Sequence, residues 1–205
     1  GCPQGFQPKA SPPERRQRKR HCRLRSCRHL GPCGELASLV SSSQQIRSHI
    51  ARHGIDQFTF EDFQLVTSKV AIDPERLVLV GGQAIEVWGF LFGVKSPKGE
   101  PLALTEDADW LGSRQDAQWL CENLSEFASY DLQMPGDFDS TPSSALVFIK
   151  RGDKHYMMDF LRTIVGPSVE EVRKLAVTVE LGGSRIQVMR PVLCMHSRMA
   201  NLEVL

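Results

Sequence analysis

The sequence lacks the hallmarks of several large classes of protein. No apolar run approaches the roughly 20 residues that a membrane-spanning helix requires, and no apolar segment follows the basic N-terminal run, as it would in a secretory signal. The six histidines form neither an H-x-x-H pattern nor a catalytic triad. Cys121 and Cys194 each lie in an apolar helical pattern with no cysteine nearby, which is typical of small buried side chains. We therefore expect a soluble protein of the reducing cytoplasm, with no membrane partner.

The distribution of charge predicts two parts. A chain of 205 residues with 41% hydrophobic content is long enough to bury a core. The formal net charge of +1 conceals an asymmetry, because residues 1–34 hold nine basic residues and one acid, Glu14, whereas acids outnumber bases in the remainder. The basic part has no hydrophobic period. We therefore expect residues 1–34 to be a disordered tail and residues 35–205 to be one folded domain.

The basic tail leaves several interpretations open. Arginine-rich segments bind nucleic acid, so the tail could be a nucleic-acid-binding arm. It could equally be a non-native extension, or an organelle transit peptide, which is also rich in arginine and poor in acids. A metal site is a further alternative, although the spacing of the candidate ligands matches no standard zinc pattern. These candidates are Cys22, Cys27, Cys33, His21 and His29.

A glycine pair marks the first candidate binding site. Residues 77–80 are predicted to form a buried strand that ends at Gly81 and Gly82, and residues 83–92 to form a helix. A helix that starts directly after glycines presents free backbone N–H groups and the positive end of its dipole at one point, which suits a phosphate group. The alternative is an ordinary connection between strand and helix that binds nothing.

Two aspartates supply a candidate metal site. Asp107 and Asp109 lie two residues apart in the predicted strand 103–111, so both carboxylates leave the same face of that strand. Two carboxylates on one face suit Mg²⁺, which takes oxygen ligands and completes its octahedron with phosphate oxygens and water. As an alternative, carboxylates at strand ends are often solvated or cap the next helix.

A third aspartate lies in a predicted β-hairpin. Residues 144–149 and 155–161 are short apolar runs joined by a link that contains Gly152, which is typical of a hairpin. Asp159 therefore sits in a strand with at least one buried face, where an ionised carboxylate is costly unless it is paired or binds a cation. A cation shared with Asp107 and Asp109 would remove that cost.

The remaining elements are mainly scaffold. The pattern of apolar and capping residues predicts helices over residues 35–53, 59–70, 113–129 and 168–174. Two strands are predicted around Gly182 and Gly183, and residues 131–141 are predicted to form a loop. Arg162 and Lys174 are candidates for phosphate contact, with surface salt bridges as their alternative role.

The order of these motifs resembles the nucleotidyltransferase superfamily of DNA polymerase β-like fold. The shared pattern is a Gly-Gly pair at a helix start, an Asp-x-Asp strand and one more Asp on a later strand. More narrowly, the flanking residues resemble bacterial nucleotidyltransferases related to AbiEii-type toxins. The resemblance covers about residues 76–205 and rests on residues 80–84 with Trp88, residues 105–112, residues 158–161, residues 189–191 and residues 197–202. It implies an α/β fold of the α+β kind, with a mixed β-sheet flanked by helices.

The resemblance also implies a role for each site residue. Asp107, Asp109 and Asp159 would be the catalytic residues and would bind Mg²⁺ or Mn²⁺. A nucleoside triphosphate (NTP) would be the substrate, and its binding residues would be Gly81, Gly82, Gln83, Thr105 and Arg162. The reaction would move a nucleoside monophosphate to an acceptor hydroxyl and release pyrophosphate.

The sequence identifies neither the acceptor of the nucleotide nor whether the domain is catalytically active. A transfer RNA, a protein and a small molecule all offer suitable hydroxyls, and the likeness to toxins implies an antitoxin partner. One alternative is a catalytically inactive nucleotide-binding or regulatory module of the same fold. Another is a nucleic-acid-interacting protein that acts through its basic tail.

Two departures from the family pattern bear on these expectations. Residues 93–101 make the link between the glycines and Asp107 long, and they are predicted to form an exposed loop. In the related toxins a basic residue from a following helical region contributes to the site. The chain stops at Leu205 before such a region, so we expect a domain truncated at its C-terminus or a degenerate form.

Overall fold

The computed structural model describes residues 42–95, 104–136 and 139–203. The predictions for the tail at residues 1–34, and for most of the link at residues 93–101, concern residues outside these ranges. Among the described residues, no helix has the length and apolar character needed to span a bilayer.

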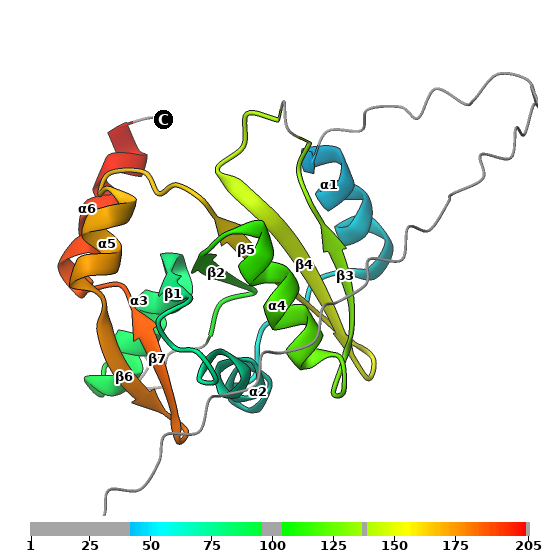
Figure 1. Cartoon of the computed structure of the whole chain (residues 1–205), viewed down its shortest axis with the longest axis horizontal. Coiled ribbons are helices and arrows are strands. Elements are labelled where there is room, and N and C mark those ends of the chain that lie inside the picture. Colours follow the sequence, from blue (N-terminus) through cyan, green and yellow to red (C-terminus); the bar gives the residue numbers. More distant parts are fainter. Residues whose placement is uncertain (1–41, 96–103, 137–138, 204–205) are drawn as a thin grey trace, which may run out of the picture. The chain divides into compact units, whose positions relative to one another are not determined.

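The described part of the chain combines helices with strands, some of which follow one another directly as hairpins (Figure 1). In chain order the elements are α1 (Ser42–His53), α2 (Phe60–Val70), β1 (Val78–Val80), α3 (Gly81–Leu91), β2 (Asp107–Leu111), α4 (Arg114–Leu124), β3 (Ser129–Gln133), β4 (Ser143–Arg151), β5 (Lys154–Leu161), α5 (Val169–Leu175), β6 (Val177–Leu181), β7 (Ser184–Val188) and α6 (Pro191–Glu203).

The strands of the described residues form one mixed sheet of order β3-β4-β5-β2-β1-β7-β6. Strand β2 pairs in parallel with β5, and β1 pairs in parallel with β7, while the other neighbours are antiparallel. The predicted α/β class, a mixed sheet flanked by helices, is confirmed. The topology places β1, which leads into the glycine pair, directly beside β2, which carries the Asp-x-Asp motif.

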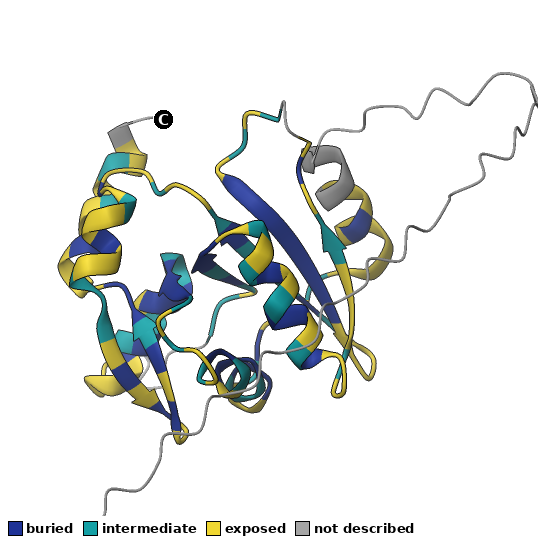
Figure 2. Ribbon diagram, viewed as in Figure 1, coloured by how far each residue is buried: buried dark blue, intermediate teal, exposed yellow. Residues whose placement is uncertain are grey.

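The side chains of β2 point alternately to the two faces of the sheet. On one face, Ala108 and Trp110 of β2 are fully buried, and the Trp110 ring stacks on Phe63 of α2 with centroids 6.5 Å apart. Helix α2 contacts α4, which packs on β3 and β4. The opposite face, called the acid face below, carries Asp107, Asp109 and Asp159 because side chains alternate along a strand. Figure 2 shows the buried strands running between exposed outer surfaces.

Capping residues explain where two of the predicted helices begin. The Thr59 hydroxyl accepts a hydrogen bond from the Asp62 N–H at the start of α2. At the start of α4, Ser113 and Asp116 form a reciprocal capping box, with bonds of 2.8 and 3.3 Å. Helix α4 ends at Leu124, earlier than the sequence predicted, and Phe127 beyond it is 48% exposed. The spacing of apolar residues that predicted the helix therefore continues beyond its last residue, Leu124, into a turn.

Strand β3 corrects one prediction. Residues 131–141 were expected to form a loop, but Ser129–Gln133 pairs with β4 at the edge of the sheet. Its first three residues are exposed and the next two are only half-buried. Strand β3 therefore lacks the alternation of apolar and polar residues that signals a strand in a sequence.

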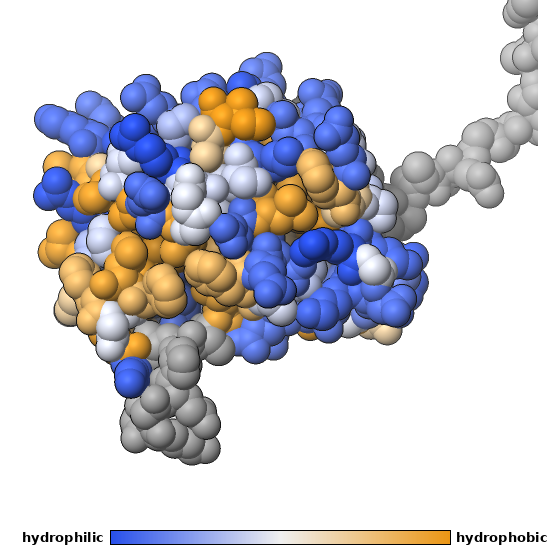
Figure 3. Space-filling view, turned by 90° about the horizontal axis from the view of Figure 1, so that it is seen from below, coloured by the Kyte–Doolittle hydropathy of each residue, from blue (hydrophilic) through white to orange (hydrophobic). Residues whose placement is uncertain are grey.

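Apolar side chains also gather on part of the surface (Figure 3). At the C-terminal end of α3 and just after it, Phe90 and Phe92 are 57% and 68% exposed. The Phe90 ring lies 5.5 Å from the ring of Phe60, and the Phe92 ring lies 5.7 Å from that of Trp88. This apolar end of α3 is opposite to its glycine-bearing N-terminus, where the candidate site lies.

Candidate functional site

The turn from β1 into α3 is built around Gly81. Its φ of +66° lies in the left-handed region that favours glycine. A Cβ at this position would overlap the Asp109 carboxylate and lie 2.8 Å from its Cγ. Val80 and Asp109 are paired across β1 and β2, so the sheet itself sets this close approach. The first turn of α3 therefore lies directly against one of the predicted catalytic acids.

Gly82 is enclosed by two further polar residues. A Cβ at Gly82 would lie 3.1 Å from Thr105 Cγ2 and 3.2 Å from a terminal nitrogen of Arg198. Thr105 precedes β2, and Arg198 belongs to α6. The fold thus brings together predicted site residues from both sides of the link at residues 93–101, and adds an arginine from the last helix.

The register of β2 and β5 places two of the acids side by side. Asp109 and Asp159 are direct partners in the parallel pair, and Asp107 is two residues earlier on the same face. Burial, together with the negative charges of Asp107 and Asp159, raises the pKa of Asp109 to about 7, while Arg198 opposes the shift. Burial also raises the pKa of Asp159 to about 6, with a further contribution from Asp107. Both carboxylates are therefore costly to ionise without a compensating positive charge.

The two oxygens of Asp159 have different surroundings. Oδ2 accepts a hydrogen bond of 2.9 Å from the Ser143 hydroxyl, and this bond opposes the rise in the pKa. Oδ1 is buried and has no hydrogen-bond partner within the described part of the chain. A buried carboxylate oxygen without a protein partner is suited to contact a cation or a ligand.

Gln83 and Thr105 fix the chain just before the acids. The Thr105 N–H donates a bond of 2.9 Å to Gln83 Oε1. The Thr105 hydroxyl lies 2.5 Å from Gln83 Oε1 and 2.5 Å from the main-chain oxygen of Asp107. Both side chains are thus engaged in joining α3 to the start of β2, so their contacts position the acids.

A cavity of about 180 Å³ opens at the first turn of α3. Its lining includes Gly81, Gly82 and Asp109 at one side and Arg198 and Asn201 of α6 at the other. Arg198 had no assigned role in the sequence, where it lies more than a hundred residues from Gly82. Its position beside the N-terminus of α3 and near the half-buried Asp109 carboxylate makes it the basic residue of the candidate site.

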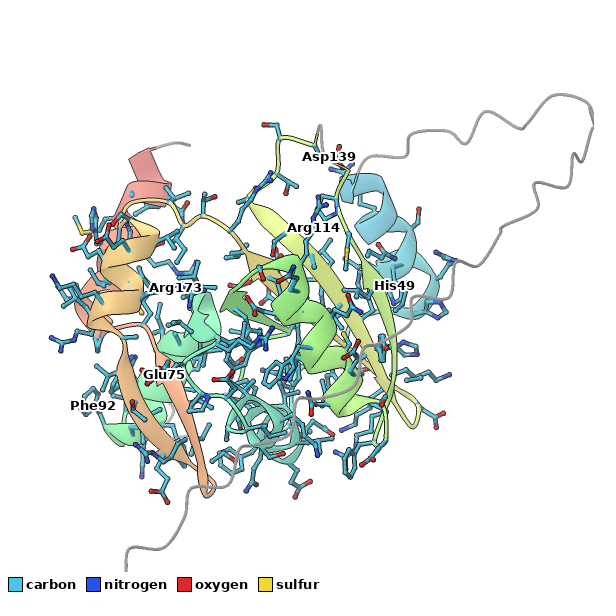
Figure 4. The ribbon with its side chains drawn as sticks, in the orientation of Figure 1. His49, Glu75, Phe92, Arg114, Asp139 and Arg173 are labelled. Atoms are coloured by element: carbon cyan, nitrogen blue, oxygen red, sulfur yellow. The ribbon has the colours of Figure 1, made fainter. Side chains whose placement is uncertain are left out.

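Arg162 and Lys174 lie elsewhere. The Arg162 guanidinium donates to the carbonyls of Thr141 (2.6 Å) and Asp139 (3.1 Å), in the loop before β4. Asp139 marks this loop in Figure 4. Lys174, on α5, lines a different hollow together with Glu75 and Arg173. The structure does not bring either residue to the cavity lined by Gly81 and Asp109.

The acidic side chains of the site have the chemistry of divalent-cation ligands. Among the described residues, however, they are not grouped closely enough to hold such a cation. Asp107, Asp109 and Asp159 are oxygen donors on adjacent strands, and Asp159 Oδ1 has no hydrogen-bond partner among the residues that the structure describes, which fits a hard cation. However, no three His, Cys, Asp or Glu side chains of the described residues are grouped closely enough to hold a metal ion. The acids share one face and one region without forming a complete set of ligands.

Comparisons with known proteins give limited likenesses. No protein-family model and no curated protein matches the sequence. A Thermotoga maritima protein provisionally described as a nucleotidyltransferase aligns over 70% of this chain and 83% of its own, with 16% identity and a TM-score of 0.46. The Megavirus polyadenylate synthase aligns over 86% of this chain, with 14% identity and a TM-score of 0.38, and this chain covers 34% of it. Because both scores are below 0.5, the functional argument rests on the residues of the site itself.

Proposed function

We propose that this protein transfers a nucleoside monophosphate from an NTP to an acceptor hydroxyl, with Mg²⁺ or Mn²⁺ as cofactor. The observation that carries the proposal is the contact of the Gly81 backbone with Asp109, whose partner across the sheet is Asp159. A helix N-terminus, which suits phosphate, and the Asp109 carboxylate, which suits a cation, thereby line one cavity, and Asp159 lies beside Asp109 in the sheet.

The N-terminus of α3 is the phosphate-binding element of the proposal. The first N–H groups of a helix have no partner within it and carry the positive end of its dipole. Val80, the residue before the helix, supplies no side-chain cap, so those N–H groups remain available. Arg198 adds a cation on the other side of Gly82. Together they would bind the negatively charged triphosphate.

The three acids are the reactive part of the proposal. Asp107 and Asp109 would hold the cation, which would bring the carboxylates closer together than they are in the structure described. A bound divalent cation would neutralise the phosphate oxygens and the departing pyrophosphate. Asp159, beside Asp109 on the acid face, would complete the ligands of the cation through one oxygen and would help to take the proton of the acceptor hydroxyl.

Pyrophosphate release tests the proposal. Each of the four labelled NTPs is incubated with the full chain and Mg²⁺, with transfer RNA, a protein extract or small hydroxyl compounds supplied in turn as acceptor. We expect pyrophosphate from at least one NTP, and its loss in Asp107→Ala and Asp109→Ala. Asp153→Asn, which removes an exposed carboxylate in the β4–β5 turn, is the matched control and should keep activity.

A second candidate function follows from the incomplete grouping of the acids. If Asp107, Asp109 and Asp159 do not close around a cation, the same cavity would bind a nucleotide without turnover and serve a regulatory role. The observation that favours this alternative is the absence of a closely grouped ligand set in the described residues. Saturable NTP binding without pyrophosphate release, with every acceptor class, would support it over catalysis.

A further inference from the structure

The start of β4 holds one oxygen of Asp159. The Ser143 hydroxyl donates to Asp159 Oδ2 at 2.9 Å, and Ser143 is only 7% exposed. Oδ1 of the same carboxylate is buried and has no partner among the described residues. A carboxylate fixed through one oxygen has a defined orientation, so the second oxygen is aimed rather than free to rotate.

An irregularity of the strand makes Ser143 available for this contact. The register of β4 and β5 shifts between Ser143 and Ala145, which is typical of a β-bulge. The neighbouring Ser144 is equally buried but has other partners, because its hydroxyl lies within hydrogen-bond distance of the main-chain oxygens of Gly112 (2.8 Å) and Phe160 (2.9 Å), which share its single donor hydrogen. Two adjacent serines thus serve different parts of the structure, and only the first reaches the acid face.

Arg162 secures the segment that leads into Ser143. Its guanidinium donates to the carbonyls of Asp139 and Thr141, and its own N–H donates to the Pro142 carbonyl at 2.9 Å. The Ser143 N–H in turn donates to the Thr141 hydroxyl at 3.2 Å. The arginine three residues after Asp159 therefore anchors the loop that leads into Ser143, the residue whose hydroxyl holds Asp159.

We infer that Ser143 is a positioning residue, which orients Asp159 so that Oδ1 faces the cation site, and that Arg162 supports it through the loop at residues 139–142. The inference deepens the proposed function and rests on it. Hydrogen bonds to a ligating carboxylate from outside the ligand set fix its orientation, and their loss typically weakens metal affinity by about 10- to 100-fold. Neither Ser143 nor Arg162 needs to touch the substrate.

Direct cation binding tests this role without relying on turnover. Mn²⁺ is titrated into the full chain and free Mn²⁺ is followed by its paramagnetic resonance signal. We expect Ser143→Ala to bind Mn²⁺ about 10- to 100-fold more weakly than the unaltered protein. Ser143→Thr keeps the hydroxyl and should restore binding, whereas Ser144→Ala should bind as the unaltered protein does. Arg162→Gln should weaken binding in the same direction as Ser143→Ala, and it provides a second route if Ser143→Ala does not fold.

The possible failures can be told apart. Equal Mn²⁺ affinity in Ser143→Ala and the unaltered protein, both folded by circular dichroism, would overturn the positioning role while leaving the proposed function intact. Equal losses in Ser143→Ala and Ser144→Ala, without rescue by Ser143→Thr, would also overturn it, because they would indicate general damage to β4. An unaltered protein that binds neither Mn²⁺ nor NTP would overturn the proposed function itself.

Discussion

Gly81 and Asp109 lie in direct contact at the centre of the candidate site. The residue before Gly81 pairs with Asp109 across the two strands, and the helix that starts at Gly81 leaves no room for a Cβ beside the carboxylate. The element suited to phosphate and the element suited to a cation are therefore not independent. A substitution at Gly81 is therefore expected to displace the Asp109 carboxylate.

The first prediction concerns Gly81→Ala. The left-handed φ alone costs about 1–2 kcal/mol for a residue with a Cβ, and the overlap with Asp109 adds to that cost. Because a displacement of about 1 Å at a reactive group lowers rates by about 10²-fold, we expect a folded variant to lose activity by about that factor. Pyrophosphate release and the free energy of unfolding in urea are the measurements.

Gly152→Ala is the control for this prediction. Gly152 has a similar φ of +62°, but a Cβ there would meet no atom within 4 Å. Its free energy of unfolding should fall by the conformational cost alone, with activity retained. If both variants lose activity equally, the contact between Gly81 and Asp109 is not the cause.

The second prediction concerns Arg198→Ala. Removal of the guanidinium beside Gly82 takes away a charged partner for the triphosphate. Hydrogen bonds to charged groups contribute about 1.5–3 kcal/mol, so NTP affinity should fall about tenfold or more. Lys174→Ala, outside the cavity, should leave the affinity unchanged. Fluorescent NTP titration measures both, and an unchanged affinity in Arg198→Ala would remove that residue from the site.

The third prediction is a dependence of stability on pH in the absence of divalent cations. The pKa of Asp109 is raised from 3.8 to about 7 in the folded protein, so the folded state binds more protons than the unfolded state between these values. The contribution of Asp109 to stability is therefore fully present below about pH 4 and is lost as the pH rises through about 7. Asp109→Asn removes this titration. The difference in unfolding temperature between the variant and the unaltered protein should grow from pH 5 to pH 8, and added Mg²⁺ should shrink it.

The fourth prediction concerns the opposite pH effect at α1. The His49 ring stacks on Phe148 with centroids 3.7 Å apart, and its Nε2 is buried without a partner in the described structure. Burial lowers the pKa of His49 from 6.5, the nearby His53, His155 and Arg52 lower it further, and Asp131 opposes them. The neutral ring is the one that packs, so its contribution to stability is lost as the pH falls below about 6.5. The protection of the α1 amides from hydrogen exchange, taken relative to their intrinsic exchange rates at each pH, should therefore fall between pH 7.5 and pH 5.5.

His49→Phe tests the cause of that effect. Phenylalanine can stack on Phe148 but cannot take up a proton, so the protection of the α1 amides, relative to their intrinsic exchange rates, should change little with pH in this variant. His196→Ala, on α6, is the control and should behave as the unaltered protein. A pH dependence that persists in His49→Phe would assign the effect to another group.

The sequence predicted those parts of the fold that have local signals. The caps at Thr59 and Ser113 and the apolar hairpin strands gave helices and strands close to those observed. Strand β3 was missed because its side chains are mostly exposed, so its pairing with β4 leaves no mark on its own residues. The alternation of apolar and polar residues that predicts a strand arises from the burial of one face. The side chains of an edge strand such as β3 are mostly exposed, so the alternation is missing.

The site shows the same limit. Asp107 and Asp109 could be placed on one face by spacing alone, whereas the pairing of Asp109 with Asp159 depends on a sheet order that no local pattern specifies. Arg162 was predicted to contact phosphate, and in the structure it donates to backbone carbonyls of the loop before Ser143, a contact that no local pattern around Arg162 indicates. Arg198 was missed because it joins Gly82 only through the docking of α6.

The parallel pair of β1 and β7 has a consequence for how the protein matures. These strands are separated by about a hundred residues of chain, and β7 leads directly into the helix that carries Arg198. Contacts between distant segments form late, because the loop between them must close first. During synthesis the carboxylates are therefore translated well before the arginine that faces them. The negative charges of Asp107, Asp109 and Asp159 therefore meet the positive charge of Arg198 only when β7 joins the sheet and α6 docks.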